Sequence, residues 1–461
     1  MTRSFPADFV FGSATAAYQI EGAVDEGGRG PSIWDTFSHT PGKVVDGETG
    51  DVACDHYHRR TADVAMMASL GLAAYRFSVS WPRVQPTGTG AFNPEGIAFY
   101  CDLVDELLAA GTKPMVTFYH WDLPQPLEDD GGWANRATAY AFADYAAEMA
   151  RRLGDRVWIW TTLNEPWCSA YLGYGNGVHA PGITDEVTAL TAAHHLNLAH
   201  GLGAAAIRAV LGTDAAVGVT LNPSMVRPAD PASPADAEAV RQIDAVANRV
   251  FLEPMIIGGY PEDLLADTAH LTDWSFVHDG DTELIKQRLD LLGVNYYTTM
   301  TVRALDPDES DSAGVGGPGT PFPGVRRVAV VAVDGPVTDM GWRIVPGGLT
   351  ELLLRIHRDY HVPMMITENG AAYPDAVVDG VVPDQPRIDY LRAHIDAVGQ
   401  AVDAGADVRG YLVWSLMDNF EWAYGDATRF GLVHVDYDTQ VRTPKASAHW
   451  YAELISSRTL G

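Results

Sequence analysis

The chain has 461 residues, of which 47% are hydrophobic, and carries 60 acidic side chains against 31 basic ones, for a formal net charge of −29. A field of this sign repels nucleic acid, anionic membranes and polyanionic substrates, so we expect none of these as partners. Three cysteines at unrelated spacings indicate no disulfide framework, the N-terminal residues lack the apolar core of a signal peptide, and no apolar run is long enough to span a bilayer, so a soluble cytoplasmic protein is predicted.

Apolar, β-branched strands alternate with amphipathic helices along the chain. The first apolar run, at 9–22, turns into small residues, and Gln19 follows the end of its strand. Asn93 and Pro94 open one later helix and Gly154 closes another, as helix caps commonly do. In chain order we expect further strands at 74–82, 114–121, 157–166, 216–221, 291–297, 363–370 and 408–414, separated by helices at 55–70, 94–110, 137–153, 190–211, 236–251, 349–357 and 388–402.

Eight strand-then-helix rounds predict an α/β fold, a single (β/α)8 TIM barrel with extended βα loops that covers residues 1–461 as one domain. In such a barrel the site lies at the carboxyl ends of the strands. An Asp-, Gly- and Pro-rich stretch at 303–327 lacks apolar periodicity, and we expect it to be a mobile loop rather than a domain linker.

Two of the predicted strands end in a glutamate, Glu165 and Glu368. Either one alone would be interpreted as a solvated loop carboxylate, because most Glu side chains are solvated. Two of them at the carboxyl ends of buried parallel strands favour a paired site. Two carboxyls that flank a glycosidic bond can hydrolyse it without a metal or cofactor, one protonating the leaving oxygen while the other attacks or activates water. Their separation, which decides between retention and inversion, is not readable from the sequence.

The other residues at the strand ends are mainly amides and aromatic rings. Planar amides and carboxylates bind vicinal hydroxyls, and flat rings pack against the C–H faces of a sugar, so a small neutral saccharide or glycoside is the predicted ligand. Taken singly, His120 and Trp414 could each be core residues. The strand-end set is Gln19, Arg76, His120, Trp121, Asn164, Asn295, Tyr297, Trp414, Glu421 and Trp422.

Longer segments resemble those of glycoside hydrolase family 1 β-glucosidases, and the resemblance covers essentially the whole chain. The segments are FVFGSATAAYQIEG at 9–22, YRFSVSWPR at 75–83, HWD at 120–122, TLNEP at 162–166, ITENG at 366–370 and WSLMDNFEW at 414–422.

The resemblance implies a retaining mechanism with Glu165 as acid/base and Glu368 as nucleophile. It further implies that Asn164 holds the sugar 2-hydroxyl, and that Arg76 and Tyr297 flank the nucleophile. By the same resemblance, Gln19, His120, Trp121, Asn295, Glu421 and Trp422 hold the glycone hydroxyls, Trp414 forms the floor of that subsite and Trp342 lines the aglycone side.

Two residues, Glu421 and Glu165, distinguish this chain from family members with related activities. The similar 6-phosphoglycosidases have a serine and basic residues near the position of Glu421, whose charge would repel a phosphate dianion. Thioglucosidases typically lack the acid, whereas Glu165 is present. A β-glucosidase acting on unphosphorylated glucosides, for example in cellulose degradation, is therefore predicted, with β-galactosides and β-fucosides as further substrates. A transglycosylating enzyme and a catalytically silent sugar-binding barrel remain alternatives, and aglycone preference and oligomeric state stay open.

Overall fold

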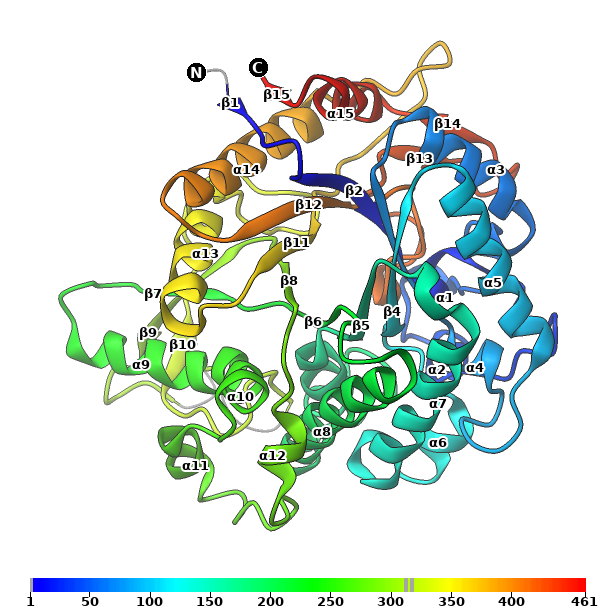
Figure 1. Ribbon diagram of the computed structural model, residues 1–461. Coiled ribbons are helices and arrows are strands. Elements are labelled where there is room, and N and C mark those ends of the chain that lie inside the picture. Colours follow the sequence, from blue (N-terminus) through cyan, green and yellow to red (C-terminus); the bar gives the residue numbers. More distant parts are fainter. Residues whose placement is uncertain (1–2, 311–313, 316–318) are drawn as a thin grey trace.

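The computed structural model describes residues 3–310, 314–315 and 319–461. Eight parallel strands close into a barrel in the order β11-β12-β2-β3-β4-β5-β6-β8 (Figure 1). The predicted (β/α)8 barrel is therefore confirmed, and each predicted strand supplies one barrel strand. Their bounds are β2 Val10–Ala14, β3 Ala74–Ser78, β4 Lys113–Tyr119, β5 Ile159–Asn164, β6 Val217–Leu221, β8 Leu291–Asn295, β11 Met364–Asn369 and β12 Val408–Trp414.

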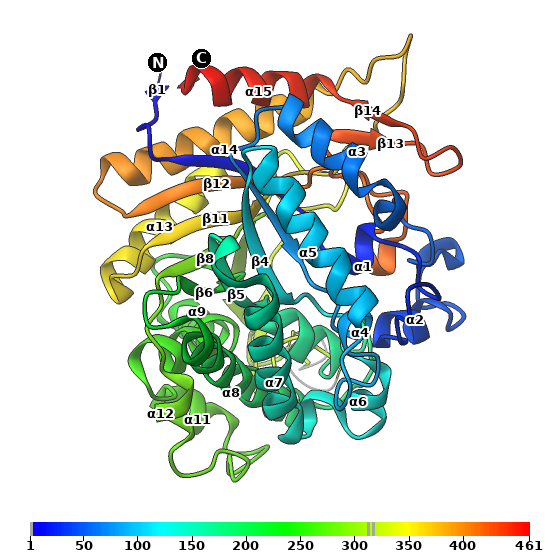
Figure 2. The same cartoon turned by 45° about the vertical axis from the view of Figure 1, so that its right-hand side comes forward.

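Helices lie around the outside of the barrel (Figure 2). The Asn93 side chain caps α5, as predicted, by accepting a hydrogen bond from a backbone N–H of the first turn. α8 begins at Glu186, earlier than expected, because Asp185 caps it in the same way. The segment expected as one helix over 236–251 is α9, followed by wider turns at 245–249 and the short α10 (Val250–Leu252). The longer helices are α3 His56–Ser69, α5 Pro94–Ala109, α7 Ala137–Leu153, α8 Glu186–Leu211, α9 Pro234–Asp244, α13 Pro346–Tyr360, α14 Gln385–Asp403 and α15 Ala446–Ser457.

The extended loops carry small strands that the sequence did not predict. β7 (Met225–Pro228), β9 (Thr299–Ala304) and β10 (Val328–Val330) form a three-stranded sheet outside the barrel. The stretch 303–327 runs from the end of β9 to the start of β10. Its residues 311–313 and 316–318 lie outside the described part of the chain, so its mobility remains a prediction.

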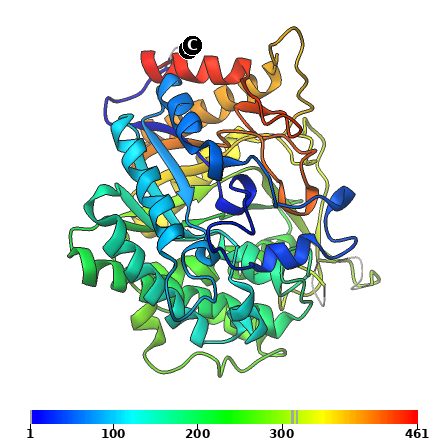
Figure 3. The same cartoon turned by 90° about the vertical axis from the view of Figure 1, so that its right-hand side faces the viewer.

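The two ends of the described chain lie side by side. β1 (Arg3–Ser4) pairs with β15 (Thr459–Leu460) in an antiparallel sheet. α15 runs along the same edge of the molecule (Figure 3). A further pair, β13 (Val433–Val435) with β14 (Arg442–Pro444), follows the long loop after β12. In the described ranges, each helix is too short or too polar to cross a bilayer.

Two apolar clusters form the core. The larger one includes the residues packed between strands and helices. The smaller one, here called the interior cluster, takes a residue from seven neighbouring barrel strands and fills the inside of the barrel. Its members are Val10, Ala74, Met115, Ile159, Leu291, Met365 and Leu412.

Candidate active site

Along β5, side chains point alternately into and out of the barrel, and this alternation breaks at the end of the strand, where Asn164 and Glu165 lie. Ile159 belongs to the interior cluster, whereas Thr162 faces outward, where its hydroxyl contacts a histidine of α8. Strict alternation would point Asn164 outward with Thr162. The pairing of β5 with β6 is irregular between Thr161 and Asn164, and Glu165 follows with a φ of 45°. This irregular end of the strand directs both side chains into the site.

β11 presents Glu368 in a similar way. Met365 belongs to the interior cluster, so alternation would point Glu368 outward. The register between β11 and β8 shifts between Ile366 and Glu368, and the glutamate side chain lines the central cavity instead. Gly370 is needed two residues later, because a Cβ there would lie 1.7 Å from the Trp414 carbonyl oxygen.

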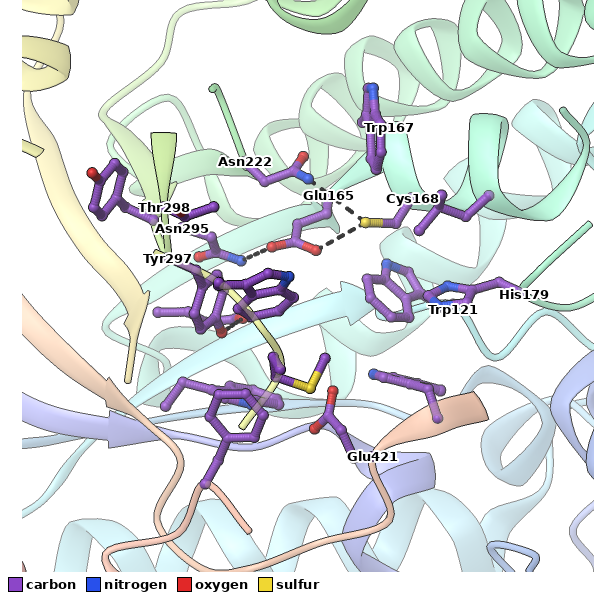
Figure 4. A pocket seen from close by; sticks show the side chains of 18 of the residues that line it. Trp121, Glu165, Trp167, Cys168, His179, Asn222, Asn295, Tyr297, Thr298 and Glu421 are labelled. Atoms are coloured by element: carbon purple, nitrogen blue, oxygen red, sulfur yellow. Dashed lines mark hydrogen bonds between the residues drawn. The ribbon is translucent and has the colours of Figure 1, made fainter. Parts of the chain in front are cut away.

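The cavity at the carboxyl ends of the strands has a volume of about 480 Å³ (Figure 4). Three of the predicted site residues, Gln19, Arg76 and Asn164, lie behind its wall and contact residues that line it. The predicted residues that line the cavity are His120, Trp121, Glu165, Asn295, Tyr297, Trp342, Glu368, Trp414, Glu421 and Trp422.

The two buried glutamates have different partners. Arg76 Nη1 donates to Glu368 Oε1 at 2.7 Å, and the Tyr297 hydroxyl donates to Glu368 Oε2 at 2.8 Å. Asn295 Nδ2 donates to Glu165 Oε1 at 2.7 Å. The two carboxyl groups line the same cavity and lie close enough for the charge of Glu368 to act on Glu165.

This environment separates the protonation states of the carboxyls. Burial, with the charge of Glu368, raises the pKa of Glu165 to about 8. Burial also raises the pKa of Glu368, but Arg76 and Tyr297 oppose that rise. Arg76 forms an ion pair with Glu368 and not with Glu165. Near neutral pH, the proton that the two carboxyls share therefore lies on Glu165. Burial and both neighbouring glutamates raise the pKa of Glu421 to about 8 as well.

Two of the predicted site residues, His120 and Gln19, each have a buried polar atom without a partner among the described residues. Asn164 Oδ1 accepts from Arg76 at 2.6 Å, so its Nδ2 donates to His120 Nε2 at 3.0 Å. Burial and the charge of Arg76 hold the pKa of His120 well below its usual range, so this ring is neutral and carries its hydrogen on the unpartnered Nδ1. Gln19 Nε2 donates toward Glu421, which leaves Gln19 Oε1 as an unpartnered acceptor. A donor and an acceptor thus remain available to a hydroxylated ligand.

Aromatic rings surround these polar groups. The His120 ring is stacked with the rings of Trp414 and Trp422, with centroids 5.8 and 6.0 Å away. Trp342 packs against Tyr297 at 5.1 Å on the wall of the cavity. Flat apolar faces combined with hydrogen-bonding atoms suit a pyranose ring. No cluster of three or more His, Cys, Asp or Glu residues that could hold a metal ion occurs in the ranges that the structure describes.

Comparison with known proteins identifies the family. The model of glycosyl hydrolase family 1 matches residues 1–460. The chain belongs to glycosyl hydrolase family 1. It is 51% identical to a bifunctional β-D-glucosidase/β-D-fucosidase of Bifidobacterium breve over 100% of both chains. The crystal structure of a psychrophilic β-glucosidase from Micrococcus antarcticus superposes with a TM-score of 0.94, at 48% identity over 99% of this chain and 98% of that one. The family 1 β-glucosidase of Thermotoga maritima in complex with isofagomine lactam gives a TM-score of 0.92 at 44% identity, over 100% of both chains.

The family 1 cavity includes residues that the sequence analysis did not select. Asn222 directly follows β6, the barrel strand whose end was not considered, so the strand-end rule would have found it. The remaining ones lie on loops or in short helical turns after the strands, where no periodicity marks an inward side chain. They include Trp167, Leu172, Val178, His179, Thr298, Met340, Tyr424 and Phe430, and Cys168, which the sequence offered only as a residue that could face the aglycone, lines the cavity with them.

Proposed function

We propose that this chain is a retaining β-glucosidase that hydrolyses terminal, unphosphorylated β-D-glucosides through a covalent glycosyl-enzyme. The observation that carries the proposal is the pair of buried glutamates with unlike surroundings, Glu165 protonated and Glu368 held by Arg76 and Tyr297. Both carboxyls line one cavity and the charge of Glu368 acts on Glu165, which supports a close pair, and retaining glycosidases need a separation of about 5 Å.

In the first half-reaction, Glu368 is the nucleophile. Its oxygen bonds to the anomeric carbon while the bond from that carbon to the leaving oxygen breaks. The proton of Glu165 passes to the leaving oxygen, which departs as a neutral alcohol.

In the second half-reaction, Glu165 is the base. Once Glu368 is esterified, its charge no longer disfavours ionisation of Glu165, which has given up its proton. Glu165 therefore takes a proton from water as the water oxygen attacks the anomeric carbon. Glu368 leaves as a carboxylate, which Arg76 and Tyr297 stabilise again.

The proposed glycone subsite includes two unpartnered polar atoms, Gln19 Oε1 and His120 Nδ1. We assign sugar hydroxyls to Gln19, His120, Trp121, Asn164, Asn295, Glu421 and Trp422, and the floor to Trp414. Glucose is the proposed glycone, and β-fucosides are proposed as a second substrate class because the Bifidobacterium relative carries that activity in its name. The carboxyl of Glu421 supplies no positive charge to pair with a 6-phosphate, and it would repel the phosphate once ionised.

The aglycone side is more apolar. Trp342 lies there with Trp167 and Met340, which suits aryl and alkyl groups as well as the next unit of a cello-oligosaccharide. We also propose that residues 1–461 act as one domain in the cytoplasm. Three cysteines without disulfide bonds fit a reducing compartment.

Proton NMR of the purified protein with an aryl β-glucoside tests the proposal. The spectrum gives both the rate of release and the anomer of glucose that forms before mutarotation. We expect β-glucose first. The appearance of α-glucose first, or no turnover of β-glucosides, β-fucosides or cellobiose, would contradict the proposed function.

A further inference from the structure

A short chain of hydrogen bonds reaches Glu165 from Asn222 through Cys168. Cys168 Sγ donates to Glu165 Oε2 at 3.2 Å, and Asn222 Nδ2 donates to Cys168 Sγ at 3.6 Å. Figure 4 shows the thiol between the two side chains. Cys168 begins the helical turn Cys168–Gly173, and Asn222 follows β6, so elements from two barrel rounds build this contact.

The direction of this hydrogen-bond chain follows from its chemistry. Asn222 donates to the sulfur, so the sulfur accepts on that side and its own hydrogen is free to point at Glu165. Burial and the charges of Glu165 and Glu368 raise the pKa of the Cys168 thiol well above its usual range. The group therefore stays an S–H donor throughout the pH range in which Glu165 titrates.

We propose that Cys168 is a positioning residue for Glu165, whose thiol fixes the carboxyl through Oε2 and favours its ionised form. Asn295 holds Oε1 at 2.7 Å, so the two contacts together prevent rotation of the carboxyl group. The ionised form is the one that acts as base on water, so the thiol assists the second half-reaction. This inference rests on the proposed acid/base role of Glu165.

Other charged and titratable groups also face Glu165. Glu368 from β11 and Glu421 after β12 oppose its ionisation, and Arg76 from β3 favours it. Tyr297, which follows β8, lies close enough for its own pKa to rise through the charge of Glu165. All four remain in a Cys168 variant, so a change in the titration of Glu165 would report the thiol alone.

The test is the pH profile of kcat/KM for an alkyl β-glucoside, whose basic limb reports the ionisation of the acid in the free enzyme. Cys168→Val keeps the volume and removes the donor, and Cys168→Ser keeps a donor. Loss of one hydrogen bond to the carboxylate should move the basic limb of Cys168→Val upward by roughly half to one pH unit. Cys168→Ser should stay at the wild-type midpoint or fall below it. Cys101→Ala, on the distant α5, is the matched control and should leave the profile unchanged.

A second measurement separates donation from packing. The leaving group of a dinitrophenyl β-glucoside needs little protonation, so kcat for this substrate reports the step in which Glu165 acts as a base. The acidic limb of the pH profile of kcat should move to higher pH in Cys168→Val and not in Cys168→Ser. An equal shift of the acidic limb in both variants would assign the effect to packing and overturn the proposal. A Cys168→Val profile that does not shift would also overturn it. Failure of the wild-type protein to hydrolyse any β-glucoside would instead contradict the proposed function.

Discussion

The inside of the barrel and its carboxyl end are built on opposite principles. The interior cluster is apolar, with residues such as Met115 and Leu412 fully buried and no charge to satisfy. The carboxyl end buries two glutamates and an arginine within one hydrogen-bonded network. It also holds Trp121, Glu165 and Trp422 at positive φ, a region that non-glycine residues rarely adopt.

This difference indicates which half stabilises the fold and which performs chemistry. Burying apolar side chains stabilises a protein, whereas burying carboxyls that must change their charge opposes stability. Strained or unsatisfied groups persist where the surrounding structure holds them. Substitutions at the two regions should therefore have separable effects.

The largest effect is expected for Glu368→Gln, which removes the nucleophile and keeps the side-chain shape. The value of kcat/KM for an aryl β-glucoside should fall by roughly 10⁴-fold or more, because no covalent intermediate can form. Circular dichroism and thermal unfolding should show an intact fold. Activity within about tenfold of the wild-type value would remove Glu368 from the mechanism.

Glu165→Gln should have a smaller effect that depends on the leaving group. Removal of the acid should lower kcat/KM for alkyl β-glucosides by roughly 10²- to 10⁴-fold, and less for dinitrophenyl β-glucoside. In the wild-type protein, the pKa of Glu165 at about 8 means that kcat/KM is lost as pH rises through that value. The Glu165→Gln profile should lack this basic limb, and a limb unchanged in the variant would assign it to another group.

Met115→Ala should lower stability, because Met115 belongs to the apolar interior cluster of the barrel. Truncating this fully buried side chain should lower the free energy of unfolding by about 2–5 kcal/mol, because a cavity replaces apolar contacts. The value of kcat per folded molecule should not change, since Met115 lies in the interior cluster away from the cavity lining. Leu108→Ala, at an exposed position of α5, is the control and should change stability by no more than about 0.5 kcal/mol.

The smallest effect is expected for Glu421→Gln and concerns stability against pH. Folding raises the pKa of Glu421 from 4.5 to about 8. Ionisation of this carboxyl therefore favours the unfolded state, and the wild-type protein loses stability as pH rises from about 4.5 to 8. A neutral glutamine should not contribute to this loss. The melting temperature of Glu421→Gln should therefore match the wild-type value near pH 4.5 and exceed it by a few kelvin at pH 8. A constant difference across this range would show that the effect is not linked to titration.

The sequence by itself determined the fold and ten of the residues that line the cavity, both glutamates among them. Strands and helices alternate in eight rounds, and a closed parallel barrel brings the carboxyl ends of its strands to one face, so Glu165, Asn295 and Glu368 were placed together from pattern alone. The same rule, applied to β6, would have added Asn222. The resemblance to the family supplied Trp342, which lies on a loop without periodicity.

Only the tertiary structure decided how these residues act on one another. Alternation alone would have pointed Asn164 and Glu368 out of the site, and the register shifts that direct them inward depend on the neighbouring strands β6 and β8. The protonation states depend on burial and on contacts from other barrel rounds, such as Arg76 on Glu368. The contact between Asn222 and Cys168 likewise joins residues from two barrel rounds. Local sequence specifies periodicity, whereas distances and electric fields between residues far apart in the chain exist only once the barrel has closed.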